Sequence, residues 1–150
     1  MKYFKFLVIN IIAFSLLFFL ISLLFPSQLV TSKSISVVAG KEKITAKLVN
    51  TEDWKQWNGF ISGNATVTNT ASDKDTLIFS LENNSSNKLE SHFNIYQEQT
   101  NSVLLSWALI EKLPWYKPWR KFSAMVLSKQ VAAVMDSSLN NLKTQIEAGK

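Results

Sequence analysis

The stretch VLLSWALIEKLPWYKPWRKFSAMVLSKQVAAVMDSSLNNLKTQIE, residues 103–147, decides the fold of this 150-residue chain. Its first part alternates in hydrophobicity and places Val103, Leu105 and Trp107 on one side, which predicts a strand with one apolar face. Pro118 suits the first turn of a helix, because its missing N–H would have no partner there. The stretch therefore predicts a strand, a short break and a helix.

The helix is expected to be unusually long. Residues 119–146 contain no proline or glycine, which predicts a rod of about 42 Å at 1.5 Å per residue. An apolar stripe at helical spacing marks the face that packs on the sheet: Ala124, Leu127, Val131, Met135, Leu139, Leu142 and Ile146. The first half is apolar nearly all round, so we expect more than the sheet to contact it.

Aromatic and basic residues alternate where this helix begins. The aromatic ones are Trp115, Tyr116 and Trp119, and the basic ones are Lys112, Lys117, Arg120 and Lys121. Such a mixture is typical of the headgroup layer of a bilayer. It is more often typical of a helix start with buried tryptophans and solvated lysines, so we favour that interpretation and keep membrane contact as the alternative.

Upstream segments predict the rest of an antiparallel meander. Leu77, Phe79 and Leu81 share one face, and so do Leu89, Phe93 and Ile95. Polar turns at 83–87 and 99–101 separate the strands. A weaker strand is expected at 64–70. The sheet should have one apolar and one mixed face.

The segment before the meander predicts one strand and two short helices. Residues 34–38 alternate loosely and read as a strand that Ala39-Gly40 ends. Residues 41–49 suit a short helix, and Thr51 is a fair N-cap for a second one that carries Trp54 and Trp57. About five strands are therefore expected.

The N-terminal segment predicts a membrane anchor. Residues 6–25 carry no charge, and twenty residues at the helical rise span about 30 Å, the thickness of a hydrocarbon core. No small-x-small cleavage site follows. Lys2 and Lys5 precede the run, which favours a cytoplasmic N-terminus and a domain on the other side. We divide the chain into an anchor (1–26), a linker (27–33) and a domain (34–150).

The order of elements and four sequence pieces resemble a known superfamily. The pieces are LFPSQLVTSKSISV (24–37), LVNTEDWKQWNGF (48–60), LSWALIEKLPWYKPWRKF (105–122) and SLNNLKTQIE (138–147). The chain resembles the SRPBCC or START-like superfamily, in its membrane-anchored bacterial branch named polyketide cyclase/dehydrase. The resemblance implies an α+β helix-grip fold, in which an antiparallel sheet wraps on a long C-terminal helix after one N-terminal transmembrane helix. It also implies a location in the bacterial inner membrane.

The chain departs from the family pattern in several places. Ala39-Gly40-Lys41-Glu42 stands where the family has Ala-Pro-Pro-Glu, and Asn58-Gly59-Phe60 replaces a second Pro-Trp. Ser138 stands in the place of a glycine. Five strands instead of the usual seven would enclose a smaller cavity, so a relative's ligand capacity does not transfer directly.

The resemblance implies a hydrophobic cavity between the sheet and the C-terminal helix. Periodicity gives the side chains expected to line it and bind a ligand: Leu77, Phe79, Phe93, Ile95, Leu105, Trp107, Leu127, Val131 and Met135. Trp54 and Trp57 are candidates for the pocket mouth, or for a plug that packs a helix onto the sheet. An apolar lining of this kind is typical of ligand sites and equally of a filled core.

Composition limits the available chemistry. The chain has no cysteine and a single histidine, which excludes disulfides, thiolate metal sites and two-histidine mechanisms. His92 falls on the mixed face without a carboxylate at a fixed close spacing. The net charge of +5 comes with no dense basic stripe, so no nucleic-acid partner is expected. No catalytic residue, metal site or cofactor is predicted.

Three functions remain as hypotheses. The first is a membrane-tethered binding module for a hydrophobic small molecule or lipid, with the bilayer itself as a partner. The second is a non-catalytic structural or interaction domain with a filled core. The third, a cyclase or dehydratase, needs an inward-facing acid–base group that the pattern does not supply.

Overall fold

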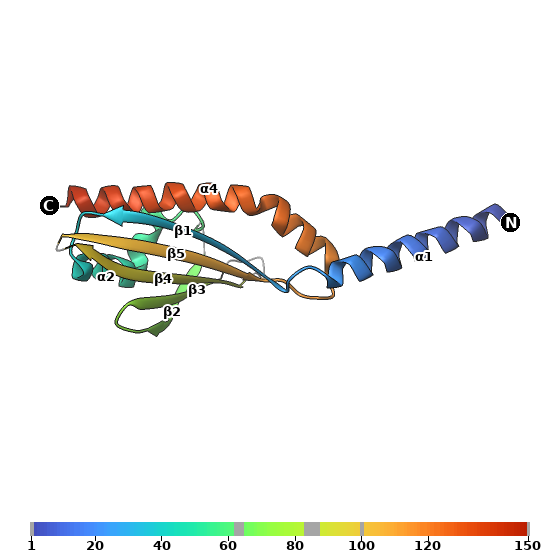
Figure 1. Ribbon diagram of the computed structural model, residues 1–150, viewed down its shortest axis with the longest axis horizontal. Helices are drawn as coiled ribbons and strands as arrows, with labels where there is room; N and C mark the ends of the chain where they lie inside the picture. The colour runs from blue at the N-terminus through green and yellow to red at the C-terminus, as the bar shows by residue number, and fades with distance from the viewer. Residues whose placement is uncertain (1, 62–64, 83–87, 100, 150) are drawn as a thin grey trace. The chain divides into compact units, whose positions relative to one another are not determined.

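The computed structural model describes residues 2–61, 65–82, 88–99 and 101–149 (Figure 1). In chain order its elements are α1 (Lys2–Leu23), β1 (Gln28–Val37), α2 (Lys41–Val49), the 3-10 turn η1 (Thr51–Asp53), α3 (Trp54–Trp57), β2 (Thr66–Ser72), β3 (Thr76–Glu82), β4 (Lys88–Gln99), β5 (Ser102–Lys112) and α4 (Pro118–Ala148). The predicted order of one strand, two short helices, a meander and a long helix is confirmed.

The chain forms two compact units. Unit 1 comprises Met1–Leu29 and Lys112–Leu127, and unit 2 comprises Val30–Glu111 and Ser128–Lys150. Helix α4 therefore gives its first turns to unit 1 and its remaining turns to unit 2.

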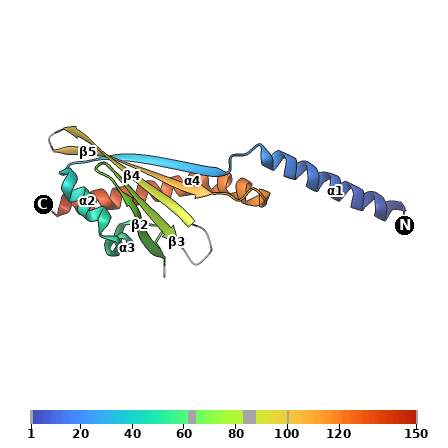
Figure 2. The same cartoon turned by 90° about the horizontal axis from the view of Figure 1, so that it is seen from below.

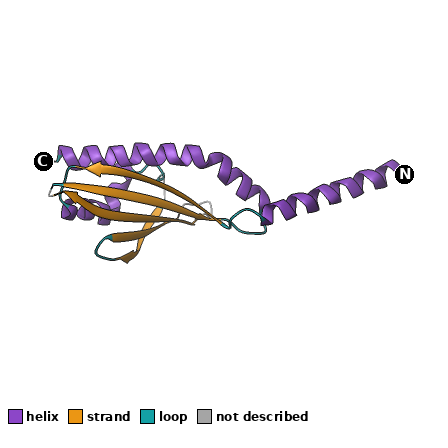
Figure 3. Cartoon of the chain, in the orientation of Figure 1, coloured by secondary structure: helices purple, strands orange, loops and turns teal. Residues whose placement is uncertain are grey.

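Unit 2 is built on a five-stranded antiparallel sheet with the strand order β1-β5-β4-β3-β2. Strands β2 to β5 follow the chain as a meander, and β1 adds to the free edge of β5. The C-terminal part of α4 runs along one face of this sheet (Figures 1 and 2). Colouring by secondary structure separates the layer of strands from the helical layer (Figure 3). The arrangement is the predicted α+β one.

Cross-strand register brings the predicted apolar faces together. Leu77 pairs with Phe93, and Phe93 pairs with Trp107, so one row of large side chains crosses three strands. Ile95 pairs with Leu105 in the next row. All five are buried. Because side chains alternate between the faces of a strand, this register puts the whole apolar set on the face that the helices cover.

Helix α4 closes this face with its predicted stripe. Met135, Leu139, Leu142 and Ile146 are buried in the same core. Burial of four such side chains contributes about 6–12 kcal/mol, as an upper estimate from area. That is comparable with the whole net stability of a typical domain, about 5–15 kcal/mol. The contact between α4 and the sheet is therefore essential to the fold of unit 2.

Strand β1 starts earlier than its sequence suggested. It begins at Gln28 and not at residue 34, so residues 28–33 of the predicted linker belong to the strand. The inward positions of this first half include Thr31 and Lys33, whose polarity hides the alternation. Lys33 is held in place by an ion pair with Asp136 of α4, with 2.7 Å between Nζ and Oδ2.

Unit 1 contains α1, a helix long and apolar enough to cross a membrane. Nearly all its side chains are exposed up to Leu20. Its last turn is different, because Ser22 is buried and the carbonyls of Ser22 and Phe25 accept hydrogen bonds from the Lys121 ammonium at 3.0 and 3.1 Å. The Leu113 N–H also donates to the Ser27 carbonyl at 2.8 Å. The segment at 112–127 therefore packs on the end of α1.

Candidate functional site

The inner face of the sheet carries a cluster of five aromatic side chains. The cluster, which we call the aromatic cluster, consists of Trp54, Trp57, Phe79, Phe93 and Trp107, all buried. Alternation along β3, β4 and β5 supplies three of them. Helix α3 is a single turn, and its i, i+3 spacing directs both of its tryptophans to the same side.

The rings of the aromatic cluster contact one another directly. Trp54 packs edge-to-face on Phe79 and Phe93, with centroid distances of 4.7 and 5.6 Å. Trp57 packs on Phe93 and Trp107 at 6.3 and 6.1 Å. Phe93 stacks on Trp107 at 5.2 Å. These distances are those of close aromatic packing, so α3 acts as a plug on the sheet.

Polar atoms inside the aromatic cluster fall into two groups. The Trp54 Nε1–H donates to the Leu48 carbonyl at 2.8 Å. By contrast, Trp57 Nε1, Trp107 Nε1 and the Ser91 hydroxyl are buried without a hydrogen-bond partner among the described residues. Each unpaired buried polar group costs about 1–3 kcal/mol. The interior therefore holds two indole donors and a hydroxyl that could bind a polar group of a ligand.

A surface pocket of about 490 Å³ lies beside the aromatic cluster, between the α3 region and α4. Its lining includes Trp57, Asn58 and Ile61 on one side and Val134 and Ser138 on the other. Trp57 thus belongs both to the pocket wall and to the aromatic cluster. The Asn58 side chain is buried, and its Nδ2 has no partner among the described residues.

A close backbone approach fixes the bottom of this pocket. The Gly59 N–H donates to Ser138 Oγ at 2.9 Å, and that hydroxyl donates to the Val134 carbonyl at 2.7 Å. A Cβ on Gly59 would lie 2.9 Å from Val134 Cγ1, which is closer than real contacts allow. Ser138 therefore has a structural role here, as the acceptor for the Gly59 N–H.

The predicted lining residues have different environments. Leu77, Phe79, Phe93, Ile95, Leu105, Trp107 and Met135 are buried in one core, and Val131 packs against it partly buried. Leu127 is 45% exposed and belongs to unit 1. The apolar stripe predicts which face of α4 is buried, but it does not predict at which residue that burial ends.

The proposed mouth residues also differ from each other. Trp54 is fully buried and hydrogen-bonded, whereas Trp57 lines the pocket. Sequence reasoning missed Ser91 and Asn58. Ser91 shares the period-2 register of Leu89 and Phe93, so its inward position could have been found. Nothing in the pattern marks Asn58 as buried.

His92 and its neighbour Glu90 lie on the face of β4 opposite to the aromatic cluster. His92 Nε2 is 3.7 Å from Glu90 Oε2, and both residues occupy the opposite register of β4. Among the described residues, no three histidine, aspartate or glutamate side chains gather where they could hold a metal ion. The chemistry of the interior is therefore aromatic contact and hydrogen-bond donation.

Comparison with solved structures identifies this architecture. The chain matches a START superfamily protein from Mycobacterium smegmatis with a TM-score of 0.59 and 18% identity, over 81% of this chain and 99% of that one. The fold is START-like. A protein from Nitrosospira multiformis matches with a TM-score of 0.59 and 12% identity over 81% and 100% of the two chains.

The START-like fold also occurs in the di-domain aromatase/cyclase StfQ of the steffimycin pathway. That match has a TM-score of 0.60 and 8% identity, and it covers 82% of this chain but 52% of the longer StfQ chain. No family model and no curated protein sequence matches this chain. The START-like resemblance predicted from sequence is confirmed at the level of the fold.

Proposed function

We propose that the protein is a membrane-tethered binding module for a hydrophobic small molecule or lipid that carries a hydrogen-bond acceptor. The ligand would lie between the sheet and α4, against the aromatic cluster. The observation that carries the proposal is the pair of buried indole donors, Trp57 Nε1 and Trp107 Nε1, which have no acceptor among the described residues. A ligand carbonyl, carboxylate or hydroxyl would satisfy both needs of this interior, apolar contact and an acceptor.

Entry of a ligand would require movement of the α3 plug. The centroids of the aromatic rings in contact are 4.7–6.3 Å apart. A ligand would therefore have to displace side chains, because these rings are already in contact with one another. Trp57 is the natural moving part, because it borders the 490 Å³ pocket and sits on a helix of one turn. Displacement of Trp57 would open the interior toward that pocket.

The tether in this proposal is α1. Its length and apolar composition suit a membrane span. The Lys121 side chain is only 2% exposed and caps the carbonyls at the end of α1. Removal of α1 as a cleaved signal would leave that ammonium buried without these acceptors, so the cap supports a retained anchor. A tether confines the binding site near a lipid source and raises its effective concentration.

The proposed orientation places the N-terminus in the cytoplasm and the START-like domain on the outer side of a bacterial inner membrane. Lys2 and Lys5 before the apolar run support it. Protease added to intact spheroplasts should digest the domain. Digestion only after lysis would reverse the orientation without affecting the binding proposal.

Uptake of cis-parinaric acid, a fluorescent fatty acid, tests the binding function. The delipidated full chain in mild detergent should show saturable energy transfer from its tryptophans to the probe. Trp57→Phe and Trp107→Phe should each weaken binding about fivefold, the equivalent of about 1 kcal/mol for one hydrogen bond. Trp54→Phe is the matched control, since its indole already bonds Leu48. Uptake no greater than in protein-free micelles would refute the proposal.

One observation favours a second candidate, a filled interaction domain at the membrane surface. All five members of the aromatic cluster are buried and in mutual contact, as expected for a finished core. In that case the three tryptophan substitutions would alter stability, and none would alter probe uptake, because no specific uptake would occur.

A further inference from the structure

The start of α4 and the turn before it expose an unusual number of large apolar side chains. Trp115 and Trp119 are each 61% exposed, and Val126 is 78% exposed. Tyr116 and Leu127 add to this surface, and all of it belongs to unit 1. Burial of such side chains would be favourable, and α1 and α4 of this unit leave them uncovered. The surface is therefore expected to have a partner.

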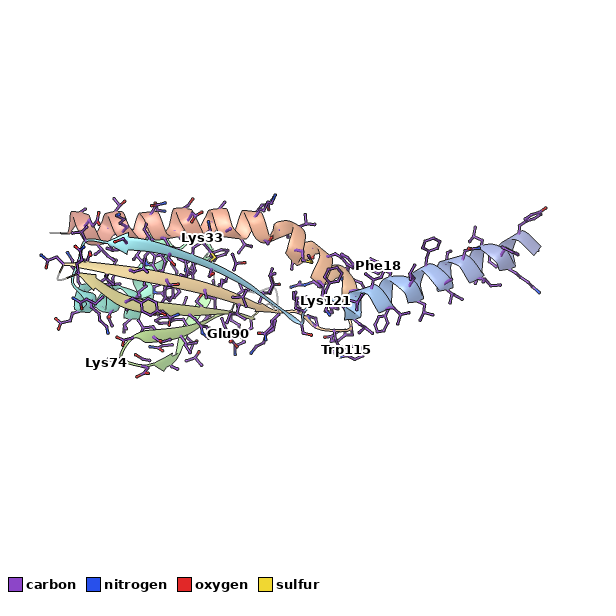
Figure 4. The ribbon with its side chains drawn as sticks, in the orientation of Figure 1. Phe18, Lys33, Lys74, Glu90, Trp115 and Lys121 are labelled. Carbon is purple, nitrogen blue, oxygen red and sulfur yellow. The ribbon has the colours of Figure 1, made fainter. Side chains whose placement is uncertain are left out.

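The same segment packs directly on the last turns of α1. Phe122 stacks on Phe18 with a centroid distance of 4.8 Å and contacts Phe25 edge-to-face at 4.9 Å. Trp115 contacts Phe19 at 6.4 Å. Figure 4 shows Phe18, Trp115 and Lys121 gathered at this end of α1. These contacts lie wholly within unit 1, so they fix the depth of the segment relative to α1.

That depth reaches into the bilayer if α1 spans it. Phe18 lies five residues before Leu23, the last residue of α1, which is about 7–8 Å along the helix at 1.5 Å per residue. A side chain that stacks on Phe18 therefore lies beside the outer part of the acyl chains. The residues next to Phe122 on α4 would then lie close to the headgroup level.

We propose that Trp115, Trp119, Val126 and Leu127 form a second membrane-contact surface that lies in the headgroup and outer acyl layer. This inference rests on the proposed anchoring by α1. The occupant is the lipid bilayer, because the surface is continuous with the span and Trp and Tyr rings favour this layer. Lys117, whose ammonium lies 5.6 Å from the Tyr116 ring centroid, adds positive charge for anionic lipids. The chain is then held at the membrane by two contacts, the span α1 and this surface, and not by α1 alone.

Site-directed spin labelling can test this surface, because the chain has no native cysteine. Single variants Val126→Cys, Ile12→Cys and Asn140→Cys place one label each on the proposed surface, in α1, and on an exposed position of unit 2. All three native side chains are exposed, so the labels should not disturb folding. The full chain is reconstituted in vesicles of phosphatidylcholine and phosphatidylglycerol. Collisions with oxygen and with a water-soluble nickel chelate then report membrane depth.

The label at Val126 should be accessible to oxygen and reached by the nickel chelate several-fold less often than the label at Asn140. Equal nickel accessibility at these two positions, with Ile12 shielded, would overturn the inference while α1 still spans the membrane. Protection at Val126 from both reagents would mean a protein partner or a second copy, which also overturns it. Nickel access at Ile12 would instead refute the anchoring itself.

Discussion

Substitution of Ser138 by alanine tests how α4 is joined to the pocket wall. Ser138 is 1% exposed, and its hydroxyl accepts the Gly59 N–H at 2.9 Å while it donates to the Val134 carbonyl. Alanine removes the acceptor and leaves the Gly59 N–H without its partner. The substitution adds no bulk, so any loss of stability reports the hydrogen bond.

The size of the effect follows from two opposing contributions. An orphaned backbone donor in a partly buried position costs about 1–3 kcal/mol. Alanine is the better helix former and returns roughly 0.5 kcal/mol. We therefore expect a net loss of about 0.5–2.5 kcal/mol in the free energy of unfolding. With a urea dependence of about 2 kcal/mol per molar, the unfolding midpoint should fall by roughly 0.25–1.25 M.

Urea unfolding of the full chain in mild detergent, followed by tryptophan fluorescence, measures this shift. Ser137→Ala is the matched control, because Ser137 is exposed on the same helix and lines the same pocket. It should leave the midpoint unchanged or raise it slightly. If Ser138→Ala were as stable as Ser137→Ala, the proposed bond between Gly59 and α4 would not stabilise the fold.

Three further substitutions probe the remaining contacts. Gly59→Ala should lower the free energy of unfolding by about 1–3 kcal/mol, because its Cβ would lie 2.9 Å from Val134 Cγ1. In a double-mutant cycle measured by thermal unfolding, Val134→Ala should partly restore this loss. Strictly additive losses of stability would contradict the clash. Trp54→Phe should destabilise the domain more than Trp107→Phe, by about 1–3 kcal/mol, because only Trp54 has an indole hydrogen bond within the described chain. If urea unfolding gave the reverse order, the Trp107 indole would be stabilised in another way. Lys121→Met removes the ammonium that caps the carbonyls at the end of α1. Hydrogen exchange of the backbone N–H groups just after α1 should therefore become faster. Lys129→Met is the control, because Lys129 is an exposed lysine of the same helix. An equal increase in exchange in this variant would argue against the cap.

Periodicity predicted the parts of the fold in which apolar residues repeat at the spacing of one element. The apolar faces that carry Leu77, Phe93 and Trp107, and the stripe from Met135 to Ile146, are buried as predicted, because the spacing that marks each face is local to its strand or helix. The five-strand count and the START-like likeness followed from the order of those elements. The ligand role of the lining residues stays a prediction.

Other features depend on contacts that a sequence pattern does not encode. Lys33 occupies an inward position of β1, where its ammonium pairs with Asp136 of α4. Lys121 was expected at the bilayer or in solvent, yet it is buried against carbonyls of α1 that lie about a hundred residues earlier. Leu127 continues the apolar stripe but is exposed in unit 1. For the two lysines, the partner comes from a distant segment of the chain.

Native mass spectrometry of the full chain, released from membranes in mild detergent, tests the ligand-binding proposal most directly. We expect one hydrophobic molecule with an acceptor group bound per chain, retained by the Trp54→Phe variant and lost or reduced in Trp57→Phe and Trp107→Phe. The mass of the bare chain alone, with no adduct in the parent protein under conditions that preserve known lipid complexes, would contradict it.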